Sequence, residues 1–75
     1  MTNKIRKISV GPNPVGENGA MHFFIGQKVC AGKFTVKYIL EKEDVYDIMI
    51  GEDDTSFLWK SVNKNMPIVI EYESL

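Results

Sequence analysis

Seven carboxylates crowd fourteen consecutive positions, and they are the residues most able to perform chemistry or bind a charged partner. They are Glu41, Glu43, Asp44, Asp47, Glu52, Asp53 and Asp54. Paired carboxylates act as acid and base where a cleft separates their pKa values, but a chain of 75 residues has little volume for one. The spacing also lacks the regular acids and closing Glu of a calcium-binding loop. The pattern is typical of a solvated acidic face, and it leaves open a surface that binds a basic partner.

Charge is segregated along the chain, although the net charge is only −1. Residues 1–37 hold six Lys or Arg and one Glu, whereas residues 38–75 hold three Lys and nine acids, which gives charges of +5 and −6. Such a field steers a charged partner toward the protein. The cations that could contact phosphates are Lys4, Arg6, Lys7, Lys33 and Lys37. A nucleic-acid-binding barrel with this lysine face is one hypothesis, but the chain lacks the strong basicity of a general nucleic-acid binder.

Nucleophilic catalysis requires a nucleophile with a base in reach, and Cys30 and His22 are the only Cys–His combination available. We interpret Cys30 as a small core residue and His22 as a side chain at a strand edge. One Cys and one His cannot supply a structural zinc site, and the glycine-rich segment Gly11–Gly19 lacks the Gly-Lys-Ser/Thr ending of a P-loop. We therefore expect no enzyme activity, metal or cofactor.

The elements that position these residues are predicted to be strands, because apolar residues recur with a period of two. A long hairpin is predicted, with a turn at residues 42–44. Its inward-facing residues are predicted to be Phe34, Val36, Tyr38 and Leu40, then Tyr46, Ile48 and Ile50. Ile39 breaks the alternation. A second turn follows at residues 51–54, where Gly51 is expected to supply a positive φ.

Further strands are predicted at residues 5–10, 22–25, 57–60 and 67–73, and residues 26–29 could bend into another. In the last of these, Ile68, Ile70 and Tyr72 are expected to face inward. Residues 55–62 could instead form two helical turns. We predict a single all-β domain of residues 1–75, with a flexible Pro/Gly loop at 11–20. Five or six antiparallel strands would close into a partly open SH3-like or OB-like barrel.

Trp59 is the apolar residue with the clearest alternatives. In the core its indole N–H needs a partner, whereas on the surface it would be a natural hot spot for a protein partner. The core position is favoured because large aromatic residues fill small cores. The single cysteine favours a reducing compartment. Since neither a signal peptide nor a membrane-length apolar stretch is evident, we expect a cytoplasmic protein.

The layout of a basic first strand, a Pro/Gly loop, His-Phe-Phe-Ile-Gly-Gln-Lys-Val, a hairpin and Met-Pro-Ile-Val-Ile-Glu-Tyr resembles small accessory proteins of tailed bacteriophages. The Lys-, Asn- and Ile-rich composition is similar to that of phages of Gram-positive hosts. The resemblance carries over no functional residue. It implies a protein that binds a host protein and inhibits or redirects it.

The first hypothesis is therefore a protein-interaction module that blocks a host transcription, replication, nucleoid or defence protein. Its acidic surface, with Trp59, would engage a basic patch on that protein by steric occlusion. The lysine-face barrel is the second hypothesis. The third is a homo-oligomeric structural component in which an exposed strand edge pairs with another copy.

Overall fold

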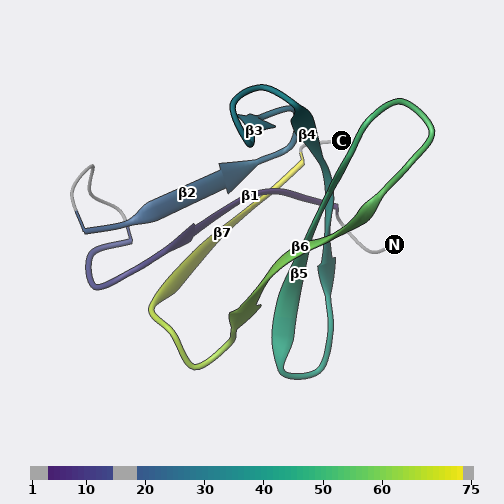
Figure 1. The fold of residues 1–75 in the computed structure, drawn as a ribbon. Coiled ribbons are helices and arrows are strands. Elements are labelled where there is room, and N and C mark those ends of the chain that lie inside the picture. Colours follow the sequence, from purple (N-terminus) through teal and green to yellow (C-terminus); the bar gives the residue numbers. More distant parts are fainter. Residues whose placement is uncertain (1–3, 15–18, 74–75) are drawn as a thin grey trace.

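The computed structural model describes residues 4–14 and 19–73, and this part of the chain is all-β (Figure 1). Its seven strands are β1 (Ile5–Val10), β2 (Met21–Phe24), β3 (Lys28–Val29), β4 (Phe34–Glu41), β5 (Val45–Gly51), β6 (Phe57–Asn63) and β7 (Ile68–Tyr72). The predicted all-β class is confirmed, with seven strands in place of the five or six predicted. The helical alternative for residues 55–62 is wrong, because β6 occupies most of that segment. No helix in the described ranges is long and apolar enough to cross a membrane. The loop predicted at 11–20 falls partly outside the described residues, since 15–18 are not among them.

The strands form two antiparallel sheets that share one core. The three-stranded sheet has the order β2-β1-β7, and the four-stranded sheet has the order β3-β4-β5-β6. The chain passes between them at residues 25–27, where the Ile25 N–H donates to the Arg6 carbonyl at 3.0 Å and the Gly26 N–H donates to the Val36 carbonyl at 2.9 Å. In Figure 1 the four-stranded sheet is strongly twisted, and its strands run at an angle to those of the three-stranded sheet.

Aliphatic side chains from the facing sides of both sheets make the core. Ile8, Val36, Ile48 and Ile50 are almost fully buried. They are joined by Ile5, Val10, Phe23, Val29, Ile39 and Val62. Burial of each such side chain contributes about 1.5–3 kcal/mol, so a core of this size is the principal source of stability for a chain this short.

A β-bulge at Lys37 reverses the phase of β4. Val36 pairs with Ile50 and Tyr38 pairs with Met49, so Lys37 is an extra residue with no partner on β5. A bulge of one residue exchanges the two faces of a strand beyond it. Accordingly Ile39 is buried at 7% exposure, whereas Tyr38 and Leu40 are 39% and 41% exposed. The prediction that Tyr38 and Leu40 face the core is wrong for this reason.

Two more irregularities bend the sheets. Arg6 is an extra residue of β1 opposite β7, and Trp59 is an extra residue of β6 opposite β5. Bulges increase local twist and bend the strand that carries them, which accounts for the curvature of sheets with such short strands. At the end of β7, Tyr72 is 44% exposed, so its predicted inward position is wrong.

Position 51 has no room for a side chain, so glycine is required there. Gly51 is not among the glycines with positive φ, which corrects the conformation predicted for it. A Cβ at Gly51 would lie 1.9 Å from the Thr55 carbonyl oxygen, so any side chain would push the β5–β6 turn apart. Cys30 also departs from its predicted core position. It is exposed in the β3–β4 turn, where its φ of 55° lies in the left-handed region.

The reversed phase of β4 predicts unequal effects at two neighbouring positions. Ile39→Ala should lower the free energy of unfolding by about 2–5 kcal/mol, because it opens a cavity in the core. Leu40→Ala, the matched control, should cost about 1 kcal/mol, since Leu40 is 41% exposed and its removal leaves no enclosed cavity. Urea unfolding of both variants measures this. Equal or reversed costs would contradict the bulge.

Candidate functional site

Most residues of the predicted acidic surface lie in two groups, one at each end of β5. Glu41, Glu43 and Asp44 lie at or beside the β4–β5 turn, whereas Glu52, Asp53 and Asp54 lie in the β5–β6 turn. β5 separates these two turns by about 20 Å, and Figure 1 shows them at opposite ends of the strand. The acids therefore do not form a continuous patch. In the described part of the chain, no group of three or more His, Cys, Asp or Glu residues is arranged to hold a metal ion.

Asp47 is held by two donors at the centre of the outer face of the four-stranded sheet. Its carboxylate accepts from Lys42 Nζ at 2.7 Å and from Ser61 Oγ at 2.6 Å, and the residue is only 5% exposed. The bonds from Lys42 and Ser61 keep the pKa of the Asp47 carboxyl below its ordinary value of 3.8, against the opposing effect of burial. Asp47 is thus an internal partner of the sheet and is not accessible as part of an acidic surface.

Most of the predicted lysine face is also dispersed or engaged. Lys37 Nζ donates to the backbone carbonyls of Glu52 and Asp53 and so holds the β5–β6 turn against β4. Arg6 lies 3.5 Å from the Glu71 carboxylate. Lys33 sits in the β3–β4 turn, with its ammonium over the Phe34 ring. Lys4 and Lys7 lie before and within β1. The structure therefore does not gather the five cations into one phosphate-binding surface.

Exposed apolar side chains gather on the outer face of the four-stranded sheet. Tyr38, Met49 and Leu58 lie opposite one another across β4, β5 and β6. Leu40 follows Tyr38 on the same face, two residues along β4. Leu58 is 52% exposed, and the Tyr38 hydroxyl lies 3.0 Å from Ser56 Oγ. We call Tyr38, Leu40, Met49 and Leu58 the outer-face cluster. Large apolar groups in contact on a surface mark an interaction site more often than scattered ones do.

The outer face of the three-stranded sheet mixes polar and apolar side chains, and its exposed apolar residues Phe24 and Val69 are separated by polar ones. Lys7 lies opposite Phe24 and Glu71, and Ser9 lies opposite His22 and Val69. Ser9 Oγ is 2.7 Å from His22 Nδ1, and both residues line a small cavity of about 210 Å³. Sequence reasoning missed this pair, because residues thirteen apart are brought together only by the register of β1 and β2. It satisfies the hydroxyl of Ser9, which is 5% exposed.

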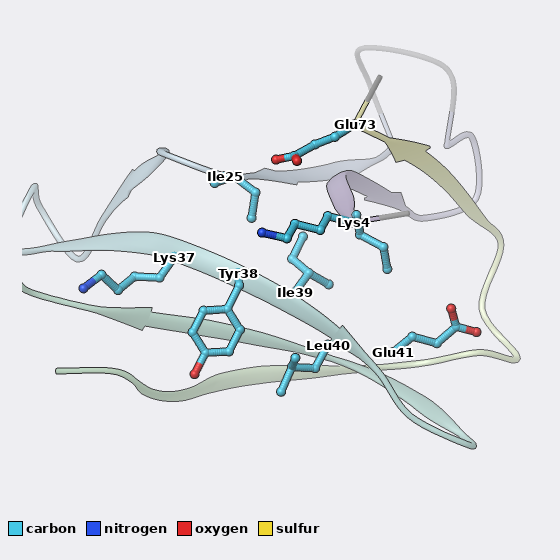
Figure 2. Close-up of a pocket in the computed structure, with 9 residues that line it drawn as sticks. Lys4, Ile25, Lys37, Tyr38, Ile39, Leu40, Glu41 and Glu73 are labelled. Carbon is cyan, nitrogen blue, oxygen red and sulfur yellow. The ribbon is translucent and has the colours of Figure 1, made fainter. Parts of the chain in front are cut away.

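A groove of about 700 Å³ opens between the two sheets (Figure 2). β4 lines one wall from Lys37 to Glu41, and Lys4, Ile5, Ile25 and Glu73 line the rest. Figure 2 shows Ile25, Ile39 and the Lys4 side chain converging in the groove, while Tyr38 and Leu40 point to the other side of β4. The groove and the outer-face cluster therefore share one strand.

Trp59 lies between its two predicted alternatives. It is half-buried, and its ring packs edge-on against Phe23 at a centroid distance of 5.7 Å. The Lys60 ammonium lies 4.9 Å from the centre of the Trp59 ring. Phe23 belongs to the core. Trp59 therefore packs against the edge of the core with part of its ring exposed.

The ionised form of Asp47 predicts a pH dependence of stability. Because the pKa of Asp47 is lower in the folded protein than in the unfolded chain, its carboxylate stabilises the fold above the ordinary value of 3.8, and this contribution is lost as pH falls through the folded pKa. Asp47→Asn should therefore be less stable than the wild type near neutrality and should lose less stability on acidification below pH 3.8. Urea unfolding between neutral and acidic pH measures both differences. A variant curve parallel to that of the wild type would contradict the proposed role of the carboxylate.

The chain matches no protein-family model, no curated protein and no solved structure in three comparisons with known proteins.

Proposed function

We propose that the protein is a protein-interaction module that binds its partner through the outer-face cluster. The observation that carries the proposal is the row Tyr38–Met49–Leu58, which places three large, exposed or half-exposed apolar side chains side by side on a rigid sheet. Tyr and Met are enriched in the centres of protein interfaces. A sheet also holds them at little entropic cost when the partner arrives.

The charged groups around the cluster are suited to a polar rim. Beside Leu40, the Asp47 carboxylate accepts hydrogen bonds from Lys42 and Ser61. The acids of the β5–β6 turn lie beyond Tyr38, which bonds to Ser56 at the end of that turn. Such rim charges affect the rate of encounter and the choice of partner more than the final affinity. Glu52, Asp53 and Asp54 would steer a partner that carries a basic patch.

We further propose that the partner is a host protein and that binding acts by steric occlusion. The resemblance to phage accessory proteins supports a host protein as the partner. The small size of the chain supports steric occlusion as the mechanism. The scaffold would be a partly open barrel of the SH3-like or OB-like kind. Its support is the curled four-stranded sheet and the three bulges that bend the strands.

Substitution within the cluster should strongly weaken capture of a partner. Wild type, Leu58→Asp and the control Met66→Asp are immobilised and exposed to a nuclease-treated lysate of a Gram-positive bacterium. Met66 is 48% exposed in the β6–β7 turn, outside the cluster. We expect one protein to be retained by wild type and Met66→Asp, and to bind Leu58→Asp at least about thirtyfold more weakly, the loss typical of an interface hot spot.

Circular dichroism and urea unfolding establish that both variants fold, as expected for exposed positions. Equal retention by Leu58→Asp and wild type would refute the outer-face cluster as the binding surface. Retention from a parallel untreated lysate that disappears after nuclease treatment would instead favour binding of nucleic acid.

A further inference from the structure

Within residues 4–14 and 19–73, the groove between the sheets exposes a length of strand edge that pairs with no other strand. β4 has β5 on one side along its length, but β3 on the other side pairs only with Phe34 and Thr35. The connection before β3 extends this pairing to Val36, through bonds with Gly26 and Gln27. From Tyr38 to Glu41, about 13 Å of strand, none of the described strands lies beside β4 on the groove side.

The hairpin register identifies which backbone groups point into the groove. The Lys42 N–H donates to the Val45 carbonyl at 2.9 Å. In an antiparallel pair, bonded and non-bonded positions alternate. Leu40 and Tyr38 are therefore the positions bonded to β5, whereas Ile39 and Glu41 direct their N–H and C=O groups away from β5 and toward the groove.

The groove also carries side-chain features that suit a peptide. Ile5, Ile25 and Ile39 supply an apolar part of its lining, which also holds the charged residues Lys4, Lys37, Glu41 and Glu73. At its wall, the Lys4 ammonium and the Glu73 carboxylate belong to adjacent chain segments joined by a bond from the Glu73 N–H to the Lys4 carbonyl. Neither side chain forms an ion pair within the described residues. Figure 2 shows the Lys4 side chain extended into the groove.

We infer that the groove binds an extended segment of the partner protein, which adds a strand to β4 at Tyr38–Glu41. This inference rests on the proposed function and names how the partner is held. Four backbone hydrogen bonds, to the N–H and C=O of Ile39 and of Glu41, set the register. A β-branched side chain of the segment enters the isoleucine lining, while an acidic and a basic side chain meet Lys4 and Glu73. The added strand continues the outer-face cluster past Tyr38 and Leu40, so both surfaces serve one interface.

The test uses synthetic peptides and a matched pair of variants. An array of peptides of about nine residues, enough to cover the edge, carries Ile or Val at alternate positions with Asp, Lys or Ser between them. The best binder is titrated by fluorescence anisotropy against wild type, Glu41→Ala and Glu41→Pro. Glu41→Ala removes the ion pair of Glu41 with Lys64 but keeps the N–H at the edge. Glu41→Pro also removes that N–H, which is not bonded to β5 and lies at an edge that tolerates proline.

We expect Glu41→Ala to bind within about twofold of wild type and Glu41→Pro about tenfold more weakly, the effect of one lost hydrogen bond and the obstructing ring. Two further peptides carry N-methyl groups, one at the odd-numbered and one at the even-numbered backbone nitrogens. Only one of the two should lose binding, because only every second N–H of the peptide faces β4. Urea unfolding confirms that Glu41→Pro is folded.

Three results would overturn the inference: no peptide of the array binds, Glu41→Pro binds as well as Glu41→Ala, or the two N-methylated peptides act alike. Self-association in sedimentation that Glu41→Pro removes would also overturn it, by assigning the edge to a second copy. If any of these results is found while Leu58→Asp still loses its protein partner, the inference is wrong and the proposed function stands. If Leu58→Asp keeps that partner while Glu41→Pro loses the peptide, the outer-face cluster falls and the edge stands.

Discussion

The single extra residue at Lys37 is the constraint on which both candidate surfaces depend. By reversing the phase of β4, the bulge puts Ile39 into the core and turns Tyr38 and Leu40 out to solvent. The same residue supplies the amine that binds the carbonyls of Glu52 and Asp53. One position therefore sets the composition of the outer face, orients the free edge of β4 and holds the neighbouring turn.

Electrostatics in this chain act mostly within the fold. The segregated charge of the sequence suggests opposing acidic and basic faces, but folding engages many of the charges locally. Asp47 is bound by Lys42 and Ser61, and Lys64 binds Glu41 at 3.0 Å. The hydrogen bond to the Glu41 carboxylate raises the pKa of the Lys64 amine above its ordinary value. What stays available for a partner is an apolar row rimmed by separate charges, and the proposed recognition is accordingly apolar at its centre and electrostatic at its edge.

The strands were predictable from the sequence, but their faces were only partly so. Alternation of apolar residues locates β1, the β4–β5 hairpin and β7 within a residue or two, because a half-buried strand requires it. It does not locate a bulge: the break at Ile39 lies just beyond the extra residue, but a residue covered on both sides of the sheet would break the pattern in the same way. Tyr38, Leu40 and Tyr72 were misplaced for this reason or because a strand end emerges into solvent. Pairing across distant strands was equally inaccessible, and it creates both the Ser9–His22 contact and the groove that joins Ile5, Ile25 and Ile39. The seven acids could be identified in the sequence, but their positions in space could not be predicted. They are separated because β5 lies between the two turns that hold most of them.

Residue-resolved amide hydrogen exchange along β4 tests the central claim most directly. The account predicts slow exchange for the amides of Tyr38 and Leu40, which bond to β5, and fast exchange for those of Ile39 and Glu41, which face the open groove. The opposite alternation would contradict the assigned phase of β4, and protection of all four amides in the free monomer would show that the edge is already occupied.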